Sequence, residues 1–295
     1  MPLRALRRAA VDASSASQDS DFPVRLLGTY IPIVSVGKGA SVSGFDLKGR
    51  VAVVTGGNGG IGLGMARGMA SAGAAIIVAG RNRDKSARAV KELLGLGAQA
   101  VAIEVDVADE GSVNALIRAS AEQLGRLDVL VNNAGMNIRK QPQDLALAEW
   151  RRVLDTNLTS AFMCSRAAYP IMKAQGGGKI INIGSMMSIF GASFAPAYAA
   201  SKGGMVQLTK SLAAAWARDN IQVNAVLPGW IDTDLTKRAR AEVSGLNSMV
   251  LMRTPVRRWG TPDDMSGIAV FLASKASDFV TGTAIPVDGG YAAQG

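Results

Sequence analysis

The chain has 295 residues, of which 48% are hydrophobic, and its formal charge is +9 at neutral pH. This length suffices for one large domain or two small ones, and no apolar run approaches the 18 residues of a transmembrane helix. The absence of histidine excludes His-based catalytic triads and His metal sites, and the single cysteine, Cys164, excludes an internal disulfide.

The positive charge is spread along the chain without a long Lys/Arg run, and only 5% of the residues are aromatic. We therefore expect neither nucleic acid nor a membrane as a partner, although a basic protein can also bind anionic small molecules. A single thiol is ordinary for a reducing compartment, so we expect a cytoplasmic protein.

The first 45 residues differ from the rest of the chain. Their opening is rich in Arg and Ser, which is typical of a transit peptide, but Asp12, Asp19 and Asp21 argue against one because such peptides are poor in acidic residues. We predict a partly ordered extension, followed by a single domain at residues 46–295.

From Phe45 onward, short runs of β-branched residues alternate with segments of helical pattern. Runs that are apolar throughout are typical of strands buried on both faces, as in a parallel sheet between helix layers. Regular alternation of strand and helix predicts a doubly wound α/β fold of the Rossmann type, with helices on both faces of the sheet. The expected strands are residues 51–55, 75–79, 100–105, 127–132, 179–184, 221–226 and 284–287.

A glycine-rich loop follows the first predicted strand and opens the first predicted helix. Five of the seven residues at 56–62 are glycine, and each costs backbone entropy when it is held in one conformation. Backbone amides at a helix start bind a pyrophosphate, and side chains there would block its approach. The context predicts a dinucleotide site rather than the alternative, a flexible turn.

Tyr198 and Lys202 are candidates for proton transfer. They are four residues apart in a helical pattern, which places them one turn apart on one face. An ammonium near a phenol favours the phenolate, so we expect the pKa of Tyr198 to fall below its usual value of about 10. A chain without histidine could thus carry a proton near neutral pH. The alternative is an ordinary pair on a helix surface.

Two further polar residues accompany this pair. Ser185 follows the fifth predicted strand and can donate a hydrogen bond to a carbonyl oxygen that becomes an alkoxide, although a turn serine would look the same. Asn157 lies on an apolar helix face with Leu154 and Leu158, so its amide must find polar partners. A satisfied core amide is the alternative there.

These motifs together resemble the short-chain dehydrogenase/reductase family over residues 46–295. The family's T-G-x-x-x-G-x-G reads Thr55 to Gly62 here, its NNAG is Asn132 to Gly135, and its Y-x-x-x-K is Tyr198 to Lys202. The resemblance implies the strand order 3-2-1-4-5-6-7 and hydride transfer between a nicotinamide and a carbonyl or secondary alcohol. It also implies catalytic roles for Asn157, Ser185, Tyr198 and Lys202, with Asn157 holding a water that links the lysine to solvent.

Cofactor contacts follow from the same resemblance. Asp106 matches the residue that contacts adenine, Asn133 and Gly135 would line the ribose side, and the segment from Pro228 would fix the nicotinamide carboxamide. In each case a loop or cap residue is the alternative. The implied set is Thr55, Gly56, Asn58, Gly60, Ile61, Gly62, Arg81, Asp106, Val107, Asn133, Ala134, Gly135, Tyr198, Lys202, Pro228, Gly229, Ile231 and Thr233.

The end of the second predicted strand favours NADP over NAD. An NAD site commonly has an acid there for the ribose 2′-hydroxyl, but no acid occurs before Asp84. Arg81 could pair with a 2′-phosphate instead. NAD stays the alternative, because Asn58 and its flanking glycines lack the basic residue of many NADP-dependent relatives, and because Arg81 and Arg83 could be solvated charges.

The substrate is indicated only by the flanking sequences, which look most similar to gluconate 5-dehydrogenases and 2-deoxy-gluconate 3-dehydrogenases. Arg139 could meet a substrate carboxylate or be a surface residue, and Met186, Met187 and Trp230 would border the pocket. A 3-oxoacyl-thioester or general carbonyl reductase is the alternative. A remote alternative is a regulator that binds a nucleotide without catalysis, but the complete set of four polar residues, Asn157, Ser185, Tyr198 and Lys202, argues against it. No metal is expected, since hydride transfer needs none.

Two features concern assembly and motion. Family members usually form homotetramers through two long helices, and the long segments 145–175 and 198–219 are rich in small apolar residues, as a monomer core would also be.

The segment at 230–258 is polar and contains Gly and Ser, so we predict a mobile lid over the substrate.

Overall fold

The computed structural model describes residues 43–293. Most of the predicted N-terminal extension, residues 1–42, lies outside the described part, as do residues 294–295. The described chain begins with a 3₁₀ turn at Ser43–Phe45.

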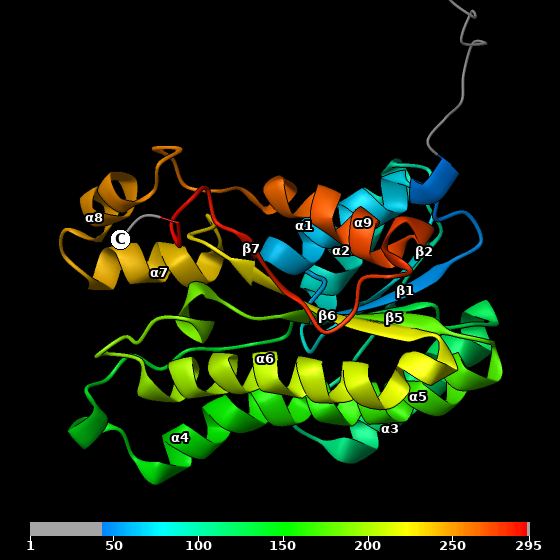
Figure 1. Ribbon diagram of the computed structural model, residues 1–295, viewed down its shortest axis with the longest axis horizontal. Helices are drawn as coiled ribbons and strands as arrows, with labels where there is room; N and C mark the ends of the chain where they lie inside the picture. Colours follow the sequence, from blue (N-terminus) through cyan, green and yellow to red (C-terminus); the bar gives the residue numbers. More distant parts are fainter. Residues whose placement is uncertain (1–42, 294–295) are drawn as a thin grey trace, which may run out of the picture. The chain divides into compact units, whose positions relative to one another are not determined.

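A parallel sheet forms the centre of the fold, with the strand order β3-β2-β1-β4-β5-β6-β7 (Figure 1). The predicted fold class and strand order are confirmed. The chain leaves β3 and returns on the far side of β1 as β4, so the order reverses between these two neighbours, and such a switch point opens a crevice at the carboxyl ends of the strands. The strands are β1 (Val51–Thr55), β2 (Ala75–Ala79), β3 (Ala100–Ile103), β4 (Val129–Asn132), β5 (Gly178–Ile183), β6 (Ile221–Pro228) and β7 (Ala284–Val287).

Two layers of helices cover the sheet, one on each face (Figure 1). Successive residues of a strand point to opposite faces, so Ala52 and Val54 of β1 pack with Met65 of the first layer. Val51 and Val53 belong to the core on the other face, which explains why the strands are apolar throughout. The first layer holds α1 (Gly60–Ser71), α2 (Arg83–Gly95) and α9 (Ser266–Ala273), and the second holds α3 (Glu110–Leu124), α4 (Leu147–Leu154), α5 (Ser160–Ala174) and α6 (Pro196–Trp216).

Two short helices follow β6 and lie beyond its carboxyl end: α7 (Asp234–Glu242) and α8 (Leu246–Arg253). They share a small apolar cluster of their own, formed by Ala239, Leu246 and Val250 with the flanking Trp230 and Trp259. The predicted lid segment is therefore a helical hairpin with its own core.

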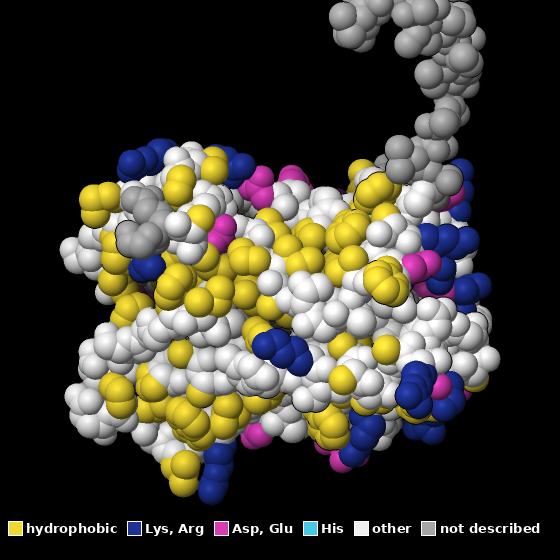
Figure 2. Space-filling model, viewed as in Figure 1, with side chains coloured by type: hydrophobic (Ala, Val, Ile, Leu, Met, Phe, Trp, Pro, Cys, Tyr) yellow, Lys and Arg dark blue, Asp and Glu magenta, His cyan; other side chains and the backbone are white. Residues whose placement is uncertain are grey.

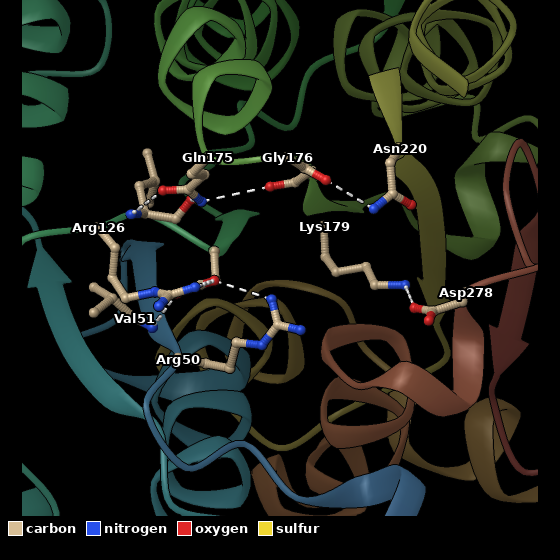
Figure 3. Close-up of polar contacts among 11 residues, drawn as sticks. Arg50, Val51, Arg126, Gln175, Gly176, Lys179, Asn220 and Asp278 are labelled. Atoms are coloured by element: carbon tan, nitrogen blue, oxygen red, sulfur yellow. Dashed lines mark hydrogen bonds and ion pairs between the residues drawn. The ribbon is translucent and has the colours of Figure 1, made fainter. Parts of the chain in front are cut away.

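A buried carboxylate holds the opposite, amino-terminal edge of the sheet together. Asp128 is 1% exposed and accepts hydrogen bonds from Arg50 (3.0 Å), Arg126 (2.6 and 2.7 Å) and the Val51 amide (2.8 Å). Figure 3 shows Arg50 and Arg126 at this edge of the sheet, together with the Lys179–Asp278 ion pair of 2.7 Å. Burial alone would raise the pKa of Asp128, but these donors outweigh it and hold the pKa below its usual value.

None of the helices within residues 43–293 combines the length and the apolar character needed to cross a bilayer.

Candidate active site

A cavity of about 670 Å³ opens at the carboxyl ends of the strands. Its volume is within the range of small-molecule and cofactor sites. It is bordered by the start of α1, the loops after β2 to β6, the start of α6 and helix α7. The predicted residues that line it are Gly56, Asn58, Gly60, Ile61, Arg81, Asp106, Val107, Asn133, Ala134, Gly135, Arg139, Ser185, Met186, Met187, Tyr198, Lys202, Pro228, Gly229, Trp230, Ile231 and Thr233.

The glycine loop presents the start of α1 to this cavity. Gly59 caps the helix and offers no side chain to the first-turn amides, which have no acceptor within the helix. Gly59 and Gly60 both line the cavity, and a Cβ added to Gly59 would meet no atom within 4 Å. An open helix N-terminus beside an unobstructed cavity fits a pyrophosphate.

Two predicted cofactor contacts lie behind the cavity wall instead. The Thr55 hydroxyl accepts from the amides of Asn133 (3.0 Å) and Ala134 (3.1 Å), so it fastens the NNAG loop to β1. A Cβ on Gly62 would come within 2.4 Å of the Asn133 amide nitrogen and 2.5 Å of the Gly56 oxygen. Thr55 and Gly62 are needed for packing between loops, and neither lines the cavity.

Two arginines follow β2 and differ in their surroundings. Arg83 is paired with Glu104 at 2.6 Å. Arg81 is exposed and lines the cavity, and among the described residues no carboxylate lies within ion-pair distance of it. Of these two arginines, Arg81 is therefore the one whose charge is available to a ligand in the cavity.

Tyr198 and Lys202 both face the cavity from the first turns of α6. The Lys202 ammonium lies 5.6 Å from the centre of the tyrosine ring and donates to the Ile183 carbonyl oxygen at 2.7 Å. Burial lowers the pKa of Lys202 to about 8. Burial also raises the pKa of Tyr198, more than the Ser185 hydroxyl and the Arg139 charge lower it. The predicted fall of the phenol pKa is thus not found, because desolvation dominates.

Ser185 lies directly beyond β5 and caps a 3₁₀ turn at Met186–Ser188. Its hydroxyl accepts from the Met187 amide at 3.1 Å, which leaves the hydroxyl proton available to a substrate. Ser188 donates to the Lys202 carbonyl oxygen at 2.7 Å and so ties this turn to α6.

Asn157 is 1% exposed and lies in a π-helical turn, Asp155–Thr159, between α4 and α5. Its side chain accepts from the Met136 amide (2.8 Å) and donates to the Met136 carbonyl (2.9 Å) and to Ser201 (3.0 Å). It does not line the cavity. The buried polar position is as predicted, and its partners show that it fastens the NNAG loop to α6.

Arg139 lines the cavity with its side chain 17% exposed. It pairs with Glu242 of α7 at 2.9 Å, and its charge acts on the Tyr198 phenol. Met186, Met187 and Trp230 line the same cavity, as predicted.

Sequence reasoning missed several residues that line the cavity, both in the loops around it and on helices α2 and α7. Lys85 and Arg238 are cations on helices, and because neither directly follows a strand, their place in the sequence does not reveal that they line the cavity. The others include Gly59, Gly80, Asn82, Asn137, Thr156, Phe194, Asp234 and Leu235. Within residues 43–293, His, Cys, Asp and Glu side chains form no group of three or more that could hold a metal ion.

Comparison with known proteins agrees with this geometry. A family model described as Enoyl-(Acyl carrier protein) reductase matches residues 56–292. The chain is 42% identical over 251 residues to 2-dehydro-3-deoxy-D-gluconate 5-dehydrogenase of Formosa agariphila, covering 85% of this chain and 95% of that protein. A short-chain type dehydrogenase/reductase from Mycobacterium marinum superposes with a TM-score of 0.81 at 35% identity, over 85% of this chain and 98% of that one.

The chain belongs to the short-chain dehydrogenase/reductase family. A further solved member is a gluconate 5-dehydrogenase from Burkholderia cenocepacia in complex with NADP and tartrate. It is 40% identical, with a TM-score of 0.81 and coverage of 85% of this chain and 98% of that one. As a member of the short-chain dehydrogenase/reductase family, the protein is an NAD(P)-dependent oxidoreductase that acts on CH–OH groups.

Proposed function

We propose that this protein uses NADP to oxidise a secondary alcohol of a sugar acid such as gluconate, or to reduce the corresponding ketone. The observation that carries the proposal is Arg139, which lines the same cavity as Tyr198 and Ser185. A guanidinium can bind a carboxylate through two parallel hydrogen bonds. It would thus hold a sugar acid by one end, with another carbon near the phenol.

The nicotinamide, when bound, supplies or accepts the hydride. Tyr198 gives its phenolic proton to the carbonyl oxygen during reduction and takes it back during alcohol oxidation. The Lys202 charge stabilises the phenolate left behind. The Ser185 hydroxyl donates a hydrogen bond to the same oxygen and stabilises the developing alkoxide. The water-mediated relay through Asn157 stays a prediction. The carbonyl oxygen and the NH2 group of its side chain both have protein partners in this structure.

NADP is supported over NAD by Arg81, which lines the cavity, whereas the open amides of α1 would serve the pyrophosphate of either dinucleotide. The Burkholderia relative named above was solved with NADP. We expect Arg81 to pair with the 2′-phosphate and the α1 amides to hold the pyrophosphate.

Nicotinamide absorbance over time tests the proposal, with D-gluconate and either NADP or NAD as substrates. Tyr198→Phe is the matched variant, and we expect turnover to fall by about 10²- to 10⁴-fold while cofactor binding persists. If Tyr198→Phe turned over gluconate as fast as the wild-type protein does, the assigned mechanism would be contradicted. Cofactor binding without turnover of any carbonyl or alcohol would favour a regulator.

A second candidate is the reduction of the keto group of a 3-oxoacyl thioester. The description of the matching family model, Enoyl-(Acyl carrier protein) reductase, favours an acyl thioester as the class of substrate. The apolar side chains of Met186, Met187 and Trp230 around the cavity would also accommodate an acyl chain. Acetoacetyl thioester with NADPH, run in parallel, distinguishes the two. Turnover of the thioester alone would assign the acyl substrate and leave Arg139 without a role.

We also propose a homotetramer. Leu147 of α4 and Phe162 of α5 are exposed hydrophobic side chains, and Figure 2 shows hydrophobic side chains gathered around α4. Phe279, near the C-terminal end, is fully exposed as well. Burial of such side chains between subunits would remove them from water. Light scattering after gel filtration measures the mass, and a monomer at micromolar concentration would refute the proposal.

A cytoplasmic location is proposed on the cysteine content. Cys164 is the only cysteine of the chain, and burial raises the pKa of its thiol to about 12, so it has little thiolate for disulfide exchange. Cell fractionation tests the location.

We further propose that residues 230–258 act as a lid. The small core of α7 and α8 would let them move as one body relative to the sheet. Hydrogen exchange across this segment should slow when NADPH and gluconate bind together. Equal exchange with and without ligands would refute it.

A further inference from the structure

Two ion pairs tie helix α7 to the rest of the domain across the cavity. Near the start of α7, Asp234 pairs with Lys85 at 2.9 Å, and at its end Glu242 pairs with Arg139 at 2.9 Å. The Arg139 guanidinium also donates to the Leu235 carbonyl oxygen at 3.5 Å. Both cations line the cavity, so the lid segment is held by groups that face the ligand.

The two pairs differ in the exposure of their side chains. Lys85 and Asp234 are 48% and 75% exposed, and pairs of this kind contribute little because water and salt screen them. Arg139 is only 17% exposed, so its charge is poorly hydrated and depends more on a carboxylate partner. Glu242 itself is 54% exposed, and it would be well hydrated once released.

We propose that Glu242 is an internal competitor of the substrate carboxylate for Arg139, an inference that rests on the proposed sugar-acid function. In the unliganded chain Glu242 neutralises the guanidinium. A sugar acid that binds Arg139 exchanges one carboxylate for another and frees the end of α7. A neutral polyol has no group that makes this exchange, and it leaves the Arg139–Glu242 pair in place. Glu242 thereby raises the KM for the sugar acid and makes the position of the lid depend on the substrate's charge.

Other charged groups nearby do not replace Glu242 in this role. The residue after Arg139, Lys140, is paired with Glu149 at 2.7 Å, so that carboxylate is engaged outside the cavity. Asp234 lies two turns before Glu242 on α7 and pairs with Lys85. Arg238, one turn before Glu242, lines the cavity and adds a second positive charge that favours an anionic ligand.

The exchange is tested with Glu242→Gln, which keeps the shape of the side chain and removes its charge. We expect the KM for D-gluconate to fall by about 3- to 10-fold with kcat little changed, as for loss of a partly buried competing ion pair. Glu149→Gln is the matched control. It makes the same change in the neighbouring Lys140 pair outside the cavity, and it should alter neither constant. Thermal unfolding of both variants confirms that they are folded.

Calorimetry with NADPH present gives a readout without turnover, because gluconate and NADPH cannot react with each other. The Kd of D-gluconate should fall in Glu242→Gln by the same factor as the KM, whereas the Kd of the neutral polyol D-glucitol should not change. An unchanged or raised gluconate Kd would overturn the inference, as would an equal shift for D-glucitol. If the inference about Glu242 is overturned but the wild-type protein still oxidises gluconate, the proposed function stands. If the wild-type protein neither binds nor oxidises gluconate, the proposed function and the inference about Glu242 are both overturned.

Discussion

The ammonium of Lys202 donates to the carbonyl oxygen of Ile183 across 2.7 Å, and this contact joins helix α6 to the end of strand β5. Ser185 lies two residues beyond Ile183, so the same contact fixes the distance between the lysine and the serine turn. The bond also holds the Lys202 ammonium in a buried position, and this burial lowers the pKa of Lys202 to about 8. The site thus maintains a buried cation at a cost in stability.

Replacing this lysine should stabilise the protein and inactivate it. The pKa of Lys202 is about 8 when folded and about 10.4 when unfolded, so the folded state binds fewer protons between these values. The resulting penalty is roughly 3 kcal/mol at pH 7 and disappears above about pH 10.4. Lys202→Met should therefore raise the free energy of unfolding at pH 7 by about 1–3 kcal/mol, since the bond to Ile183 is lost as well. Urea unfolding at pH 7 and pH 10 checks this, and a variant less stable than wild type at pH 7 would contradict it.

The same pKa predicts a pH dependence of catalysis. The rate constant kcat/KM reports groups in the free enzyme, and Lys202 is charged below about pH 8 and neutral above it. For reduction of the ketone, kcat/KM should decrease as the pH rises through about 8, because a neutral lysine no longer stabilises the phenolate of Tyr198. Initial rates from pH 6 to pH 10 measure it. A profile that is flat across pH 8 would show that the lysine charge is not required.

The cofactor preference should depend on Arg81 and not on Arg83. Arg81→Ala removes the proposed partner of the 2′-phosphate and should raise the KM for NADP by about 10- to 100-fold, as expected for a hydrogen bond between charged groups. The KM for NAD should change little. Arg83→Ala serves as the control, because that guanidinium is engaged by Glu104. Equal effects of the two substitutions on NADP would assign the preference elsewhere.

Asp128 should matter for stability alone. Its pKa is held low in the folded protein, so its contribution is complete above the unfolded pKa of about 3.9 and is lost as the pH falls through the folded value. Asp128→Asn leaves Arg50 and Arg126 without their anion and should cost about 2–4 kcal/mol at pH 7. The difference from wild type should shrink toward pH 3. Urea titrations at both pH values measure it, and full gluconate activity below the unfolding transition is expected.

The strands could be predicted well because a short, unbroken apolar run between turn residues is typical of a strand that is buried on both faces. The runs at 51–55, 75–79 and 284–287 match β1, β2 and β7, while β3 ends at Ile103, two residues before the predicted end. The cavity residues from the shared motifs were predicted because a motif fixes both spacing and order. Tyr198, Lys202 and Ser185 accordingly line one cavity.

Other features depend on the packing of segments that are distant in sequence. Thr55 does not line the cavity, because its hydroxyl accepts from the loop at Asn133, 78 residues away, and its contact with the cofactor stays a prediction. The π-helical turn around Asn157 left no recognisable sign in a segment that reads as one continuous helix. The phenol pKa was misjudged because the sequence shows the neighbouring charge and not the depth of burial.

The small apolar cluster of the α7–α8 hairpin has a consequence for how such enzymes diversify. Leu246 and Val250 pack against Ala239 of the same hairpin, with the two flanking tryptophans closing the cluster. Exchange of residues 234–253 as one block would carry this helical packing with it, while Trp230 and Ile231, which also pack in the clusters around the sheet, would stay in place. New substrate ranges could arise by recombination within this stretch, with the proton-transfer residues on α6 and Ser185 after β5 inherited unchanged.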